Sequence, residues 1–324
     1  MPRELDEDDV RVRPPRSTRP RTKDRPAHSD AVTGEVVTVD RGRYRVRVEG
    51  TIVTAVRARE LGRRAVVVGD RVALVGDVTG RTDTLARVVR FEPRTSLLRR
   101  SPDDTDPMER AVVANAEILV VVTALADPEP RQRLVDRCLV AAYDGGLVPL
   151  LCLTKSDLAS PDELLALYRP LGVEAVVTSR SSGVEELRDR LQHKRSVLFG
   201  QSGVGKSTLV NQLVPDAGRA VGEVTGVGKG RHTSTSVIAL ELPGGGTVID
   251  TPGVRSFGLG HVTPAGVLRA FPDLAPWAEE CEVGCDHVGG SCGLDAHVAA
   301  GEISAERLTS LRRLLLLKDD AAED

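Results

Sequence analysis

The sequence predicts a chain of three folded parts: a small antiparallel β-barrel, an α/β domain built on a parallel sheet, and a short helical domain. Apolar and polar residues alternate with period two between residues 31 and 93, and strand-like and helix-like segments alternate from residue 94. Cys281, Cys285 and Cys292 crowd together near the C-terminal end. A chain of 324 residues also exceeds the roughly 250–300 residues at which a single core stops growing.

The composition indicates aliphatic cores and a reducing compartment. Apolar residues make up 40% and aromatic residues 2% of the chain, so Val, Leu, Ala and Ile must fill the cores. No apolar run approaches the roughly 18–20 residues of a membrane span, and no signal-peptide core follows the N-terminus. We therefore expect a cytoplasmic protein with no membrane partner. Cys138 and Cys152 lie in apolar surroundings, which suits free thiols better than a disulfide framework.

Residues 1–30 are predicted to be a disordered Arg/Pro-rich tail. The segment RVRPPRSTRPRTKDRP carries dense charge and almost no apolar side chain, so burial cannot offset the entropy lost on folding. Two interpretations stay open: a solvated tail, and a basic arm that binds phosphate backbones.

Residues 31–93 are predicted to form a β-barrel of the OB type. In GEVVTVDRGRYRVRVEG, Tyr44, Val46 and Val48 face one way and the arginines between them face the other. Regularly spaced glycines separate further short strands. Clustered arginines on a fold often used on nucleic acids favour RNA as a partner over a merely solvated face. The arginines expected on this face are Arg43, Arg45, Arg47, Arg57, Arg59, Arg63 and Arg64.

Residues 94–262 are predicted to form the α/β domain. Ala116–Leu125 is a continuous apolar run with the length of a buried parallel strand, and the next segment has helical spacing up to Gly145 and Gly146. Two further strand–helix units lead to the strand SVLFG, and Ser160 and Pro161 are expected to cap the helix of the first, with the proline at the first helical position. Such alternation indicates a parallel sheet covered by helices on both faces.

The strand SVLFG runs into GQSGVGKS, which fits the phosphate-loop pattern G-x-x-x-x-G-K-S and precedes the helical segment STLVNQL. In this context, backbone N–H groups wrap the phosphates and the helix N-terminus faces their charge. Lys206 would reach the β- and γ-phosphates, and Ser207 would hold Mg²⁺. The predicted nucleotide-binding residues are Gly200, Gln201, Ser202, Gly203, Val204, Gly205, Lys206, Ser207 and Thr208.

A second phosphate-side motif, DTPG, closes the strand GTVID. Asp250 at the strand end is expected in the magnesium shell, and Gly253 places a backbone N–H near the γ-phosphate. Between the two motifs lies GVGKGRHTSTS, a polar, glycine-rich segment that we predict to be mobile. Thr233 or Thr235 of this switch segment would close on Mg²⁺ when triphosphate is bound, and the sequence leaves both threonines open.

The sequence TKSD ends the strand LVPLLCL and resembles the N/T-K-x-D motif that reads guanine in GTPases. Asp157 can accept the N1–H and 2-amino donors of guanine, which adenine does not offer together, and the stem of Lys155 can lie along the ring. Thr154 stands where asparagine is commoner, and Ser156 completes the loop. One strand–helix unit later, in VVTSRSSG, a backbone amide of Thr178 or Ser179 is expected at guanine O6.

These motifs occur in an unusual order. The base motif comes first, and the phosphate loop, the switch segment and DTPG follow it, whereas ordinary GTPases run the other way. We therefore predict a circularly permuted P-loop GTPase domain that binds GTP or GDP, since permutation keeps a core and moves the chain ends to new loops.

Residues 263–324 are predicted to be a zinc-binding helical domain. The pattern Cys281-x3-Cys285-x-His287-x4-Cys292 places three thiols and an imidazole close together, a ligand set that suits one tetrahedral Zn²⁺ per chain. A set of small buried residues is the alternative. A cysteine nucleophile is disfavoured, because no second His or carboxylate pattern marks one.

The last helix, SAERLTSLRRLLLLKDD, is amphipathic. Its leucines are expected to pack against the rest of the chain. Arg307, Arg312 and Arg313 are expected to face solvent or a phosphate partner.

A β-barrel, a permuted GTPase domain and a Cys-Cys-His-Cys segment in this order resemble the bacterial family of GTPases that depend on the small ribosomal subunit. GQSGVGKSTLVN, KGRHTSTS and DTPGVRSFGL carry most of the resemblance, which spans about residues 31–318. It implies that the barrel and the zinc domain bind the 30S subunit and its 16S rRNA late in maturation, and that a monomer hydrolyses GTP under stimulation by the subunit and is then released. The metal spacers are one residue shorter each than the family's usual C-x4-C-x-H-x5-C.

The predicted catalytic residues are Lys206, Gly253 and His232. Val254 follows DTPG where Ras-like enzymes place the glutamine that orients water, and valine cannot polarise water. His232 in the switch segment is the candidate for this role, an interpretation that the family resemblance supports. A solvent-exposed loop histidine is the alternative.

Two other functions compete with an assembly GTPase. A zinc-dependent RNA-binding protein would use GTP as a structural ligand or signal without significant turnover. A P-loop kinase or ATPase is disfavoured by TKSD and DTPG together, and competition between GTP and ATP tests it.

Overall fold

The computed structural model describes most of the chain, and the structural statements that follow concern the described residues. These are residues 28–40, 42–62, 65–101, 109–215, 217–218, 221, 237–253, 258–260, 262–289 and 292–318. The chain divides into a unit of residues 1–30 and a unit of residues 31–324. The predicted tail lies almost wholly outside the described residues.

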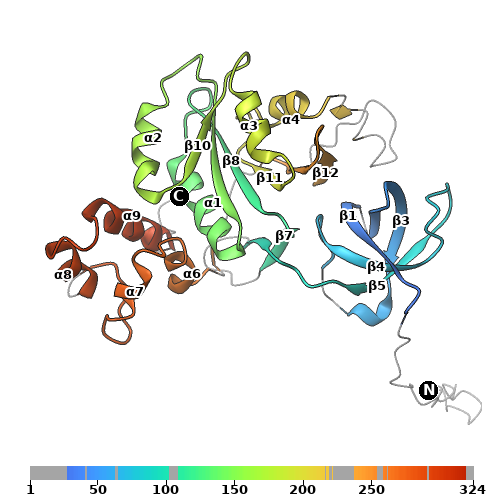
Figure 1. Ribbon diagram of the computed structural model, residues 1–324, viewed down its shortest axis with the longest axis horizontal. Helices are drawn as coiled ribbons and strands as arrows, with labels where there is room; N and C mark the ends of the chain where they lie inside the picture. Colours follow the sequence, from blue (N-terminus) through green and yellow to red (C-terminus); the bar gives the residue numbers. More distant parts are fainter. Residues whose placement is uncertain are drawn as a thin grey trace, which may run out of the picture. The chain divides into compact units, whose positions relative to one another are not determined.

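The second unit begins with a closed β-barrel (Figure 1). Its strands are hydrogen-bonded in the order β1-β2-β3-β5-β4, and β4 also pairs with β1, which closes the barrel. The pair β3–β5 is parallel and the other pairs are antiparallel. The prediction of a barrel of the OB type is confirmed. The strands are β1 (Val32–Asp40), β2 (Arg43–Val48), β3 (Thr51–Arg57), β4 (Arg71–Gly76) and β5 (Ala86–Phe91), with a 3₁₀ turn, η2, at Arg59–Leu61.

The barrel core follows the period-two pattern of the sequence. Tyr44, Val46 and Val48 are all buried, as the alternation in β2 predicts. Gly34 in β1 marks a close approach of two strands, because a Cβ there would lie 2.6 Å from the Val46 side chain and 2.8 Å from the carbonyl oxygen of Arg47. The other core residues are Val36, Val53, Ala55, Val66, Val72, Leu74, Ala86 and Val88.

The α/β domain is built on a sheet with the strand order β10-β9-β8-β11-β13-β12. All neighbouring pairs are parallel except β12–β13. The parallel sheet agrees with the strand–helix alternation of the sequence. The strands are β8 (Ile118–Ala124), β9 (Val148–Thr154), β10 (Glu174–Val177), β11 (Arg195–Phe199), β12 (Ile238–Glu241) and β13 (Thr247–Asp250).

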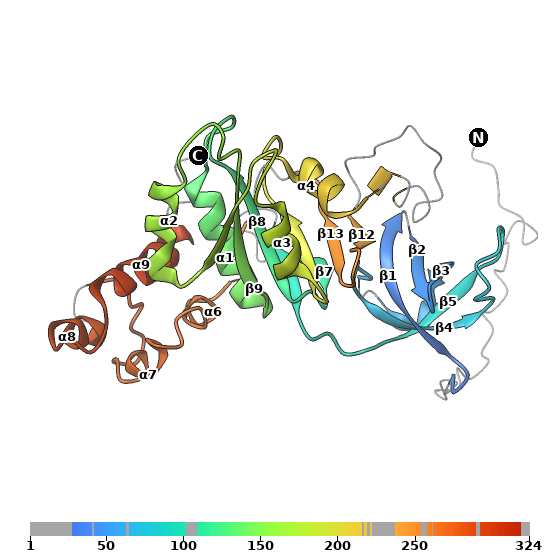
Figure 2. The same ribbon diagram turned by 45° about the horizontal axis from the view of Figure 1, so that its top comes forward.

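Helices cover both faces of this sheet (Figure 2). The crossovers through α1 (Gln132–Gly145) and α2 (Asp162–Tyr168) run along the sheet in one direction, and the crossover through α3 (Val184–Leu191) runs in the other. Because such connections are right-handed, helices of opposite crossover direction lie on opposite faces. The helix α4 (Lys206–Leu213) joins α3, since the Arg188 side chain of α3 donates to the carbonyl oxygen of Gln212 at 2.8 Å.

The predicted end of α1 agrees with the structure, whereas the predicted start of α2 differs by one residue. The helix α1 ends at Gly145, and Gly146 has a φ of +74°, a left-handed conformation that favours glycine. Pro161 is the residue before α2 and not its first helical residue, so that prediction is wrong by one position. Ser160 still supports the helix start, because its hydroxyl accepts from the Asp162 N–H at 3.3 Å.

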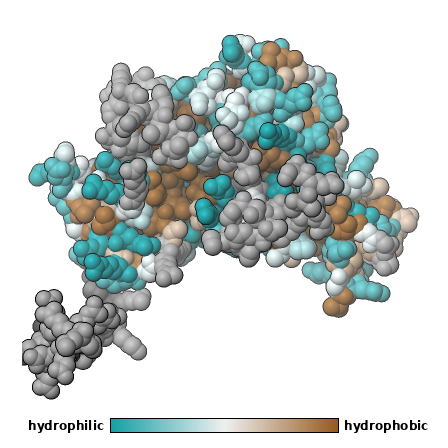
Figure 3. Space-filling view, turned by 180° about the vertical axis from the view of Figure 1, so that it is seen from behind, coloured by the Kyte–Doolittle hydropathy of each residue, from teal (hydrophilic) through white to brown (hydrophobic). Residues whose placement is uncertain are grey.

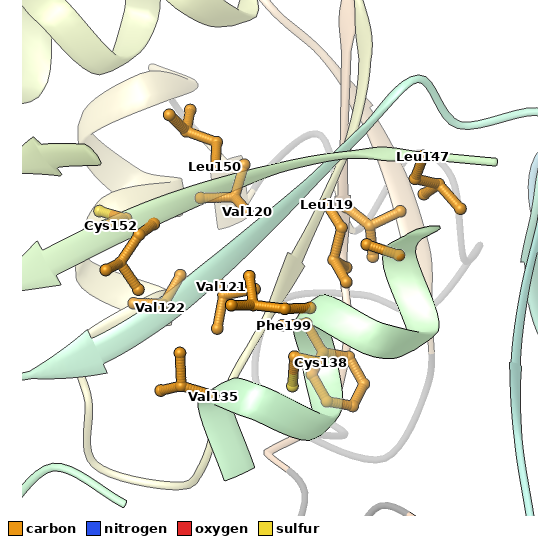
Figure 4. Close-up of a cluster of buried hydrophobic side chains, with 14 of the residues drawn as sticks. Leu119, Val120, Val121, Val122, Val135, Cys138, Leu147, Leu150, Cys152 and Phe199 are labelled. Carbon is orange, nitrogen blue, oxygen red and sulfur yellow. The ribbon is translucent and has the colours of Figure 1, made fainter. Parts of the chain in front are cut away.

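The core of the α/β domain lies between the sheet and its helices. Val121 and Phe199 point from neighbouring strands toward Val135 and Cys138 of α1 (Figure 4). The other face of the sheet carries Val120 and Val122 of β8 and Leu150 and Cys152 of β9. Burial raises the pKa of the Cys138 thiol and raises that of Cys152 to about 12, so both cysteines act as apolar core residues, as their surroundings in the sequence indicate.

The barrel and the α/β sheet share a hydrogen-bonded edge. Thr38 of β1 lies opposite Ile238 of β12, and Ile238 lies opposite Asp250 of β13. The Thr38 hydroxyl also donates to the carbonyl oxygen of Val237 at 3.2 Å. The barrel is therefore continuous with the strand that carries the predicted magnesium ligand.

Between the barrel and the sheet lies a hairpin of β6 (Leu97–Arg100) and β7 (Arg110–Ala114), which the sequence did not predict. The C-terminal part is helical, as predicted. Its elements are α6 (Pro264–Leu268), α7 (Ala275–Ala278), α8 (Gly293–Ala299) and α9 (Ala305–Leu315); η3 (Arg169–Leu171) follows α2, and η4 (Leu316–Lys318) follows α9.

The arginines of α9 were expected to face solvent or phosphate, and this expectation is wrong. Arg307 contacts Asp273 at 2.7 Å and donates to the carbonyl oxygen of Pro170 at 2.8 Å. Arg312 and Arg313 pair with Asp295 at 2.8 Å and Asp136 at 3.1 Å. Of the three carboxylates only Asp136 is buried, at 5% exposed, so it needs a partner in place of water, and Arg313 supplies it.

The predicted basic face of the barrel is also less free than expected. Arg47 is 15% exposed and pairs with Glu241 of β12 at 3.2 Å, so it holds the barrel to the sheet. Arg45 donates to the Thr54 hydroxyl at 2.9 Å. Arg43 and Arg59 are exposed, whereas Arg63 and Arg64 lie outside the described residues.

Within the described ranges, no helix has the length and apolar character needed to cross a bilayer. Figure 3 shows hydrophilic side chains distributed among hydrophobic ones over the face that it presents. The large apolar side chains that are exposed come from separate segments, a distribution that is normal for a protein surface. They are Val32, Leu85, Val148, Leu158, Val283 and Leu316.

Candidate functional site

The phosphate loop lies between β11 and α4, where the sequence places it. Gly203 and Gly205 have φ values of +83° and +98°, which only glycine adopts without strain. A Cβ on Gly200 would lie 2.2 Å from the carbonyl oxygen of Val122 in β8, so this glycine lets the loop pass close to the neighbouring strand. The backbone shaped in this way leads directly into the N-terminus of α4.

Lys206 is the first residue of α4 and is 7% exposed. Its Nζ donates to the carbonyl oxygens of Gly200 at 2.7 Å and Gln201 at 2.8 Å, so the ammonium is held by the backbone of its own loop. Burial lowers the pKa of Lys206, and Asp250 opposes this shift. Burial likewise raises the pKa of Asp250, and Lys206 opposes that shift. The loop cation and the predicted magnesium ligand therefore interact electrostatically.

The DTPG loop lies against the phosphate loop. The Thr251 hydroxyl donates to the carbonyl oxygen of Leu198 in β11 at 2.7 Å, which anchors the chain just after β13. A Cβ on Gly253 would lie 3.0 Å from the Cα of Ser202, so a glycine brings the two backbones together here. Gly253 and Asp250 are thus placed beside the loop that carries Lys206 and the exposed Ser207.

A cavity of about 420 Å³ opens where the base motif meets the phosphate loop. Lys155 and the exposed Asp157 line it from the base motif, and Gly203 and Gly205 line it from the phosphate loop. Ligand pockets of about 300–1,000 Å³ hold molecules of nucleoside size and above. The other lining residues are Asp127, Thr154, Leu158, Thr178, Ser179, Arg180, Thr208, Leu209 and Gln212.

Thr154 connects the base motif to the phosphate loop. Its hydroxyl donates to the carbonyl oxygen of Val204 at 2.6 Å, and the residue is 5% exposed. Lys155 has a φ of +60°, and its Nζ donates to the carbonyl oxygen of Asp127. This bond fixes the lysine at the edge of the cavity.

The second base loop is tied to the first, because the Ser156 N–H donates to the carbonyl oxygen of Thr178 at 3.2 Å. The backbone amides predicted to meet guanine O6 have partners within the chain. The Thr178 N–H donates to Leu153 at 2.7 Å, and the Ser179 N–H donates to Ser182 at 2.9 Å. The contact of either amide with O6 stays a prediction, and each amide would have to share or give up its present hydrogen bond.

Four residues that the sequence singled out for the hydrolysis site lie outside the described residues. His232, Thr233 and Thr235 belong to the switch segment, and Val254 follows DTPG. Their roles stay predictions.

Sequence reasoning missed several residues of the cavity. Asp127 follows β8, and the carboxyl ends of parallel strands meet at one edge of a sheet, so its position after a buried strand was a usable signal. Leu209 and Gln212 recur at helical spacing after Lys206 on α4. Arg180 carried no signal beyond its place in the second base loop.

The four predicted metal ligands come together in the C-terminal part. The ligand atoms of Cys281, Cys285, His287 and Cys292 all lie within 4.8 Å of one another. The Sγ atoms of Cys281 and Cys292 are 3.9 Å apart, and Cys292 Sγ is 3.8 Å from His287 Nδ1. A tetrahedron with Zn–S bonds of about 2.3 Å has S···S separations of about 3.8 Å. The short spacers therefore do not prevent a tetrahedral site.

The chemistry of this cluster fits a bound cation. Its three cysteines are free thiols. A Cβ on Gly293 would lie 3.2 Å from Cys281 Sγ, so a glycine leaves room for the sulfur. Burial, together with the thiols of Cys285 and Cys281, raises the pKa of Cys292 to about 11, so a thiolate there needs a cation beside it. Three sulfurs and one imidazole nitrogen at tetrahedral spacing form a donor set that suits Zn²⁺.

Comparison with known proteins gives a consistent result. A family model described as RsgA GTPase matches residues 91–260. A protein of Marinobacter nauticus named small ribosomal subunit biogenesis GTPase RsgA is 39% identical over 264 residues, which cover 78% of this chain and 73% of that protein. A protein of the same name from Pseudomonas fluorescens is 38% identical over 262 residues, which cover 78% and 74%.

Solved structures agree with this result. The crystal structure of YjeQ from Thermotoga maritima superposes with a TM-score of 0.64 at 27% identity and covers 90% of this chain and 99% of that one. YloQ, described as a circularly permuted GTPase, superposes with a TM-score of 0.64 at 23% identity and covers 92% and 98%. At the second level of identity the likeness concerns the fold alone.

Proposed function

Because the chain belongs to the RsgA GTPase family, we propose that it acts on the small (30S) ribosomal subunit during the subunit's late maturation. The chain is a GTP hydrolase; its partner, the stage of action and the coupling of hydrolysis to release are the proposed part. The relatives are named small ribosomal subunit biogenesis GTPases, which supports the 30S subunit as the partner. The observation that carries the proposed binding of GTP is the cavity that Thr154, Lys155 and Asp157 share with the phosphate loop.

GTP would bind with its base at the TKSD motif and its phosphates in the loop Gly200–Ser207. Asp157 would accept from N1–H and the 2-amino group of guanine. Lys206 would exchange its two carbonyl partners for the β- and γ-phosphates. Because the lysine is buried, its attraction for phosphate is screened little by water.

Mg²⁺ supplies neutralisation of phosphate charge when it is bound. Ser207 in the first turn of α4 and Asp250 at the end of β13 would hold it, with Thr233 or Thr235 as a further ligand. Hydroxyl and carboxylate oxygens are the ligands that Mg²⁺ prefers. The raised pKa of Asp250 would be lowered by a cation beside it, which favours the ionised carboxylate.

Hydrolysis requires a group that positions water. Val254 cannot do so, and His232 is the proposed positioning residue. Gly253 would offer its N–H to the γ-phosphate beside Lys206. A His232→Ala variant is expected to bind GTP normally and to lose the turnover that the subunit stimulates.

The remaining parts would provide contacts with the subunit. The barrel of residues 31–93 and the domain of residues 263–324, with one Zn²⁺ at Cys281, Cys285, His287 and Cys292, are proposed to contact 16S rRNA, and the domain of residues 94–262 is proposed to carry GTP hydrolysis. We propose that the protein works as a monomer in the cytoplasm, where ribosomal subunits mature.

Cosedimentation with isolated 30S subunits tests the proposed cycle. Binding is expected with a non-hydrolysable GTP analogue and loss of binding with GDP, while 50S subunits serve as the control. Equal binding to 30S subunits with the GTP analogue and with GDP would contradict the proposed coupling between hydrolysis and release. A GTP-loaded protein that binds no 30S subunits would remove the proposed partner.

A further inference from the structure

The metal cluster carries a charge that its own ligands do not balance. Three thiolates, one neutral imidazole and Zn²⁺ sum to one negative charge. Cys292 is buried and the other three ligands are half-buried, so this charge is partly removed from water. Charges withdrawn from water need an opposite charge or hydrogen bonds beside them.

We propose that Arg312 of α9 is the outer-sphere cation that stabilises the zinc centre formed by Cys281, Cys285, His287 and Cys292. This inference rests on the proposed zinc site and adds a residue that lies outside its ligand set, twenty positions after the last ligand, Cys292. No spacing pattern of metal ligands includes such a residue, so its position beside the metal loop is known only from the fold.

The guanidinium of Arg312 contacts both sides of the metal loop. Its Nε donates to the carbonyl oxygen of His287 at 3.2 Å, and its Nη2 pairs with Asp295 at 2.8 Å. The arginine therefore contacts the backbone of one ligand residue, His287, and the side chain of Asp295, three residues after the ligand Cys292.

Asp295 explains why the arginine stays in place. It lies in the first turn of α8, which begins immediately after Cys292. A planar guanidinium held at Nε by one group and at Nη2 by another has little freedom to turn. The side chain of Arg312 is 24% exposed, so water screens its hydrogen bond to the metal loop only in part.

The neighbouring residue extends this connection to the α/β domain. Arg313 pairs with the buried Asp136 of α1 at 3.1 Å and lies 5.3 Å above the ring of Tyr168. Successive residues of a helix point about 100° apart, so α9 presents one arginine to the metal loop and the next to α1. The zinc centre is thereby linked through a single helix to the domain that binds nucleotide.

Zinc affinity of the full-length protein tests the proposal. We would titrate wild type, Arg312→Gln, Arg312→Lys and Arg313→Gln with Zn²⁺ against a chromophoric chelator and measure zinc release after chelator addition. Arg312→Gln is expected to weaken zinc binding by about 10–100-fold, the usual effect of losing an outer-sphere partner, and to speed release. Arg312→Lys keeps the charge without the planar fork and is expected to lose less. Arg313→Gln removes a neighbouring arginine that contacts no ligand and is expected to bind zinc as wild type does.

The possible outcomes distinguish a failure of the proposed role of Arg312 from a failure of the proposed zinc site. A wild-type protein that binds no zinc would overturn the proposed metal site and the role of Arg312 together. If the wild-type protein binds zinc, and both Arg312→Gln and Arg312→Lys bind it as tightly as wild type does, the role of Arg312 alone is overturned. Equal losses in Arg312→Gln and Arg313→Gln would show that α9 acts through general stability and would also overturn it. If Arg312→Gln does not fold, the comparison of Arg312→Lys with wild type decides the matter.

Discussion

The hydroxyl of Thr154 donates a 2.6 Å hydrogen bond to the backbone carbonyl of Val204. The first residue belongs to the motif that we predict to read the base, and the second belongs to the loop that we predict to hold the phosphates. Both are buried, so the bond is made away from water. Threonine thus supplies the link between the two loops at a position where asparagine is the commoner residue.

Replacing Thr154 with valine removes this bond with little change in shape. The carbonyl of Val204 would be left buried without its donor, which costs about 1–3 kcal/mol. We expect Thr154→Val to weaken GDP binding by roughly 10-fold, a loss of about 1.4 kcal/mol, measured by titration calorimetry. Thr154→Ser keeps the hydroxyl and is the matched control. Unchanged affinity in Thr154→Val would show that the two loops hold their positions without the bond.

Asp157 is expected to determine the choice of base. Hydrogen bonds to a charged group contribute about 1.5–3 kcal/mol each, and two of them would hold guanine. Asp157→Asn presents an amide donor to the base edge, so it should lose GDP by about 100-fold or more and gain affinity for xanthosine diphosphate, which carries an oxygen at position 2. Competition binding with both nucleotides checks this. A variant that keeps its preference for GDP would place base recognition elsewhere in the cavity.

The buried carboxyl group of Asp136, which pairs with Arg313, is expected to make the stability of the folded protein depend on pH. Burial raises the pKa of Asp136, and Arg313 opposes the shift without cancelling it. The folded protein therefore holds this proton more tightly than the unfolded chain does. The stability that protonated Asp136 contributes is complete below the ordinary carboxyl pKa of about 3.9. It is lost as pH rises through the raised pKa of Asp136 in the folded protein.

Asp136→Asn keeps an oxygen acceptor for Arg313 and removes the buried charge. We expect its free energy of unfolding to match or exceed that of wild type at pH 7, with the difference growing as pH rises from 4. Asp136→Ala leaves the arginine unpaired and should lose on the order of 3 kcal/mol. Urea unfolding at several pH values measures both. If Asp136→Asn has a lower free energy of unfolding than wild type and the difference grows with pH, the attraction between Asp136 and Arg313 outweighs the cost of burying the carboxylate. That result would contradict the prediction.

Removing the metal is expected to loosen α9. Structural zinc contributes directly to folding, and Arg312 joins the metal loop to this helix. Hydrogen exchange measured by mass spectrometry should rise in Ala305–Leu315 after chelation and stay constant in the barrel strands β1–β5. Exchange that rises equally in both regions would indicate general unfolding, and no rise in α9 would show that the helix docks without the metal.

The features that could be predicted from sequence are those written in short contiguous stretches. The phosphate loop, TKSD and the metal pattern each lie within about a dozen neighbouring residues, and the local strand–loop–helix context gave them meaning. The alternation in β2 likewise identified Tyr44, Val46 and Val48 as core. Such patterns depend on periodicity and on the chemistry of adjacent side chains.

The features that could not be predicted depend on contacts between distant segments. The partner of Thr154 lies fifty positions away, and the partner of Arg313 lies 177 positions away. Charged residues on an amphipathic helix normally face water, so the sequence predicts solvent or a phosphate partner for Arg307, Arg312 and Arg313. Only the docking of α9 shows that they bind carboxylates. The edge shared by β1 and β12 is set by the same kind of long-range pairing.

The most direct single measurement is GTP turnover by the purified protein with and without isolated 30S subunits, with 50S subunits and ATP as controls. Intrinsic turnover should be slow, because valine replaces the water-orienting glutamine, and 30S subunits alone should raise it strongly with GTP and not with ATP. Turnover that stays slow with every ribosomal particle, or that rises equally with 50S subunits, would contradict a GTPase activated by the small subunit.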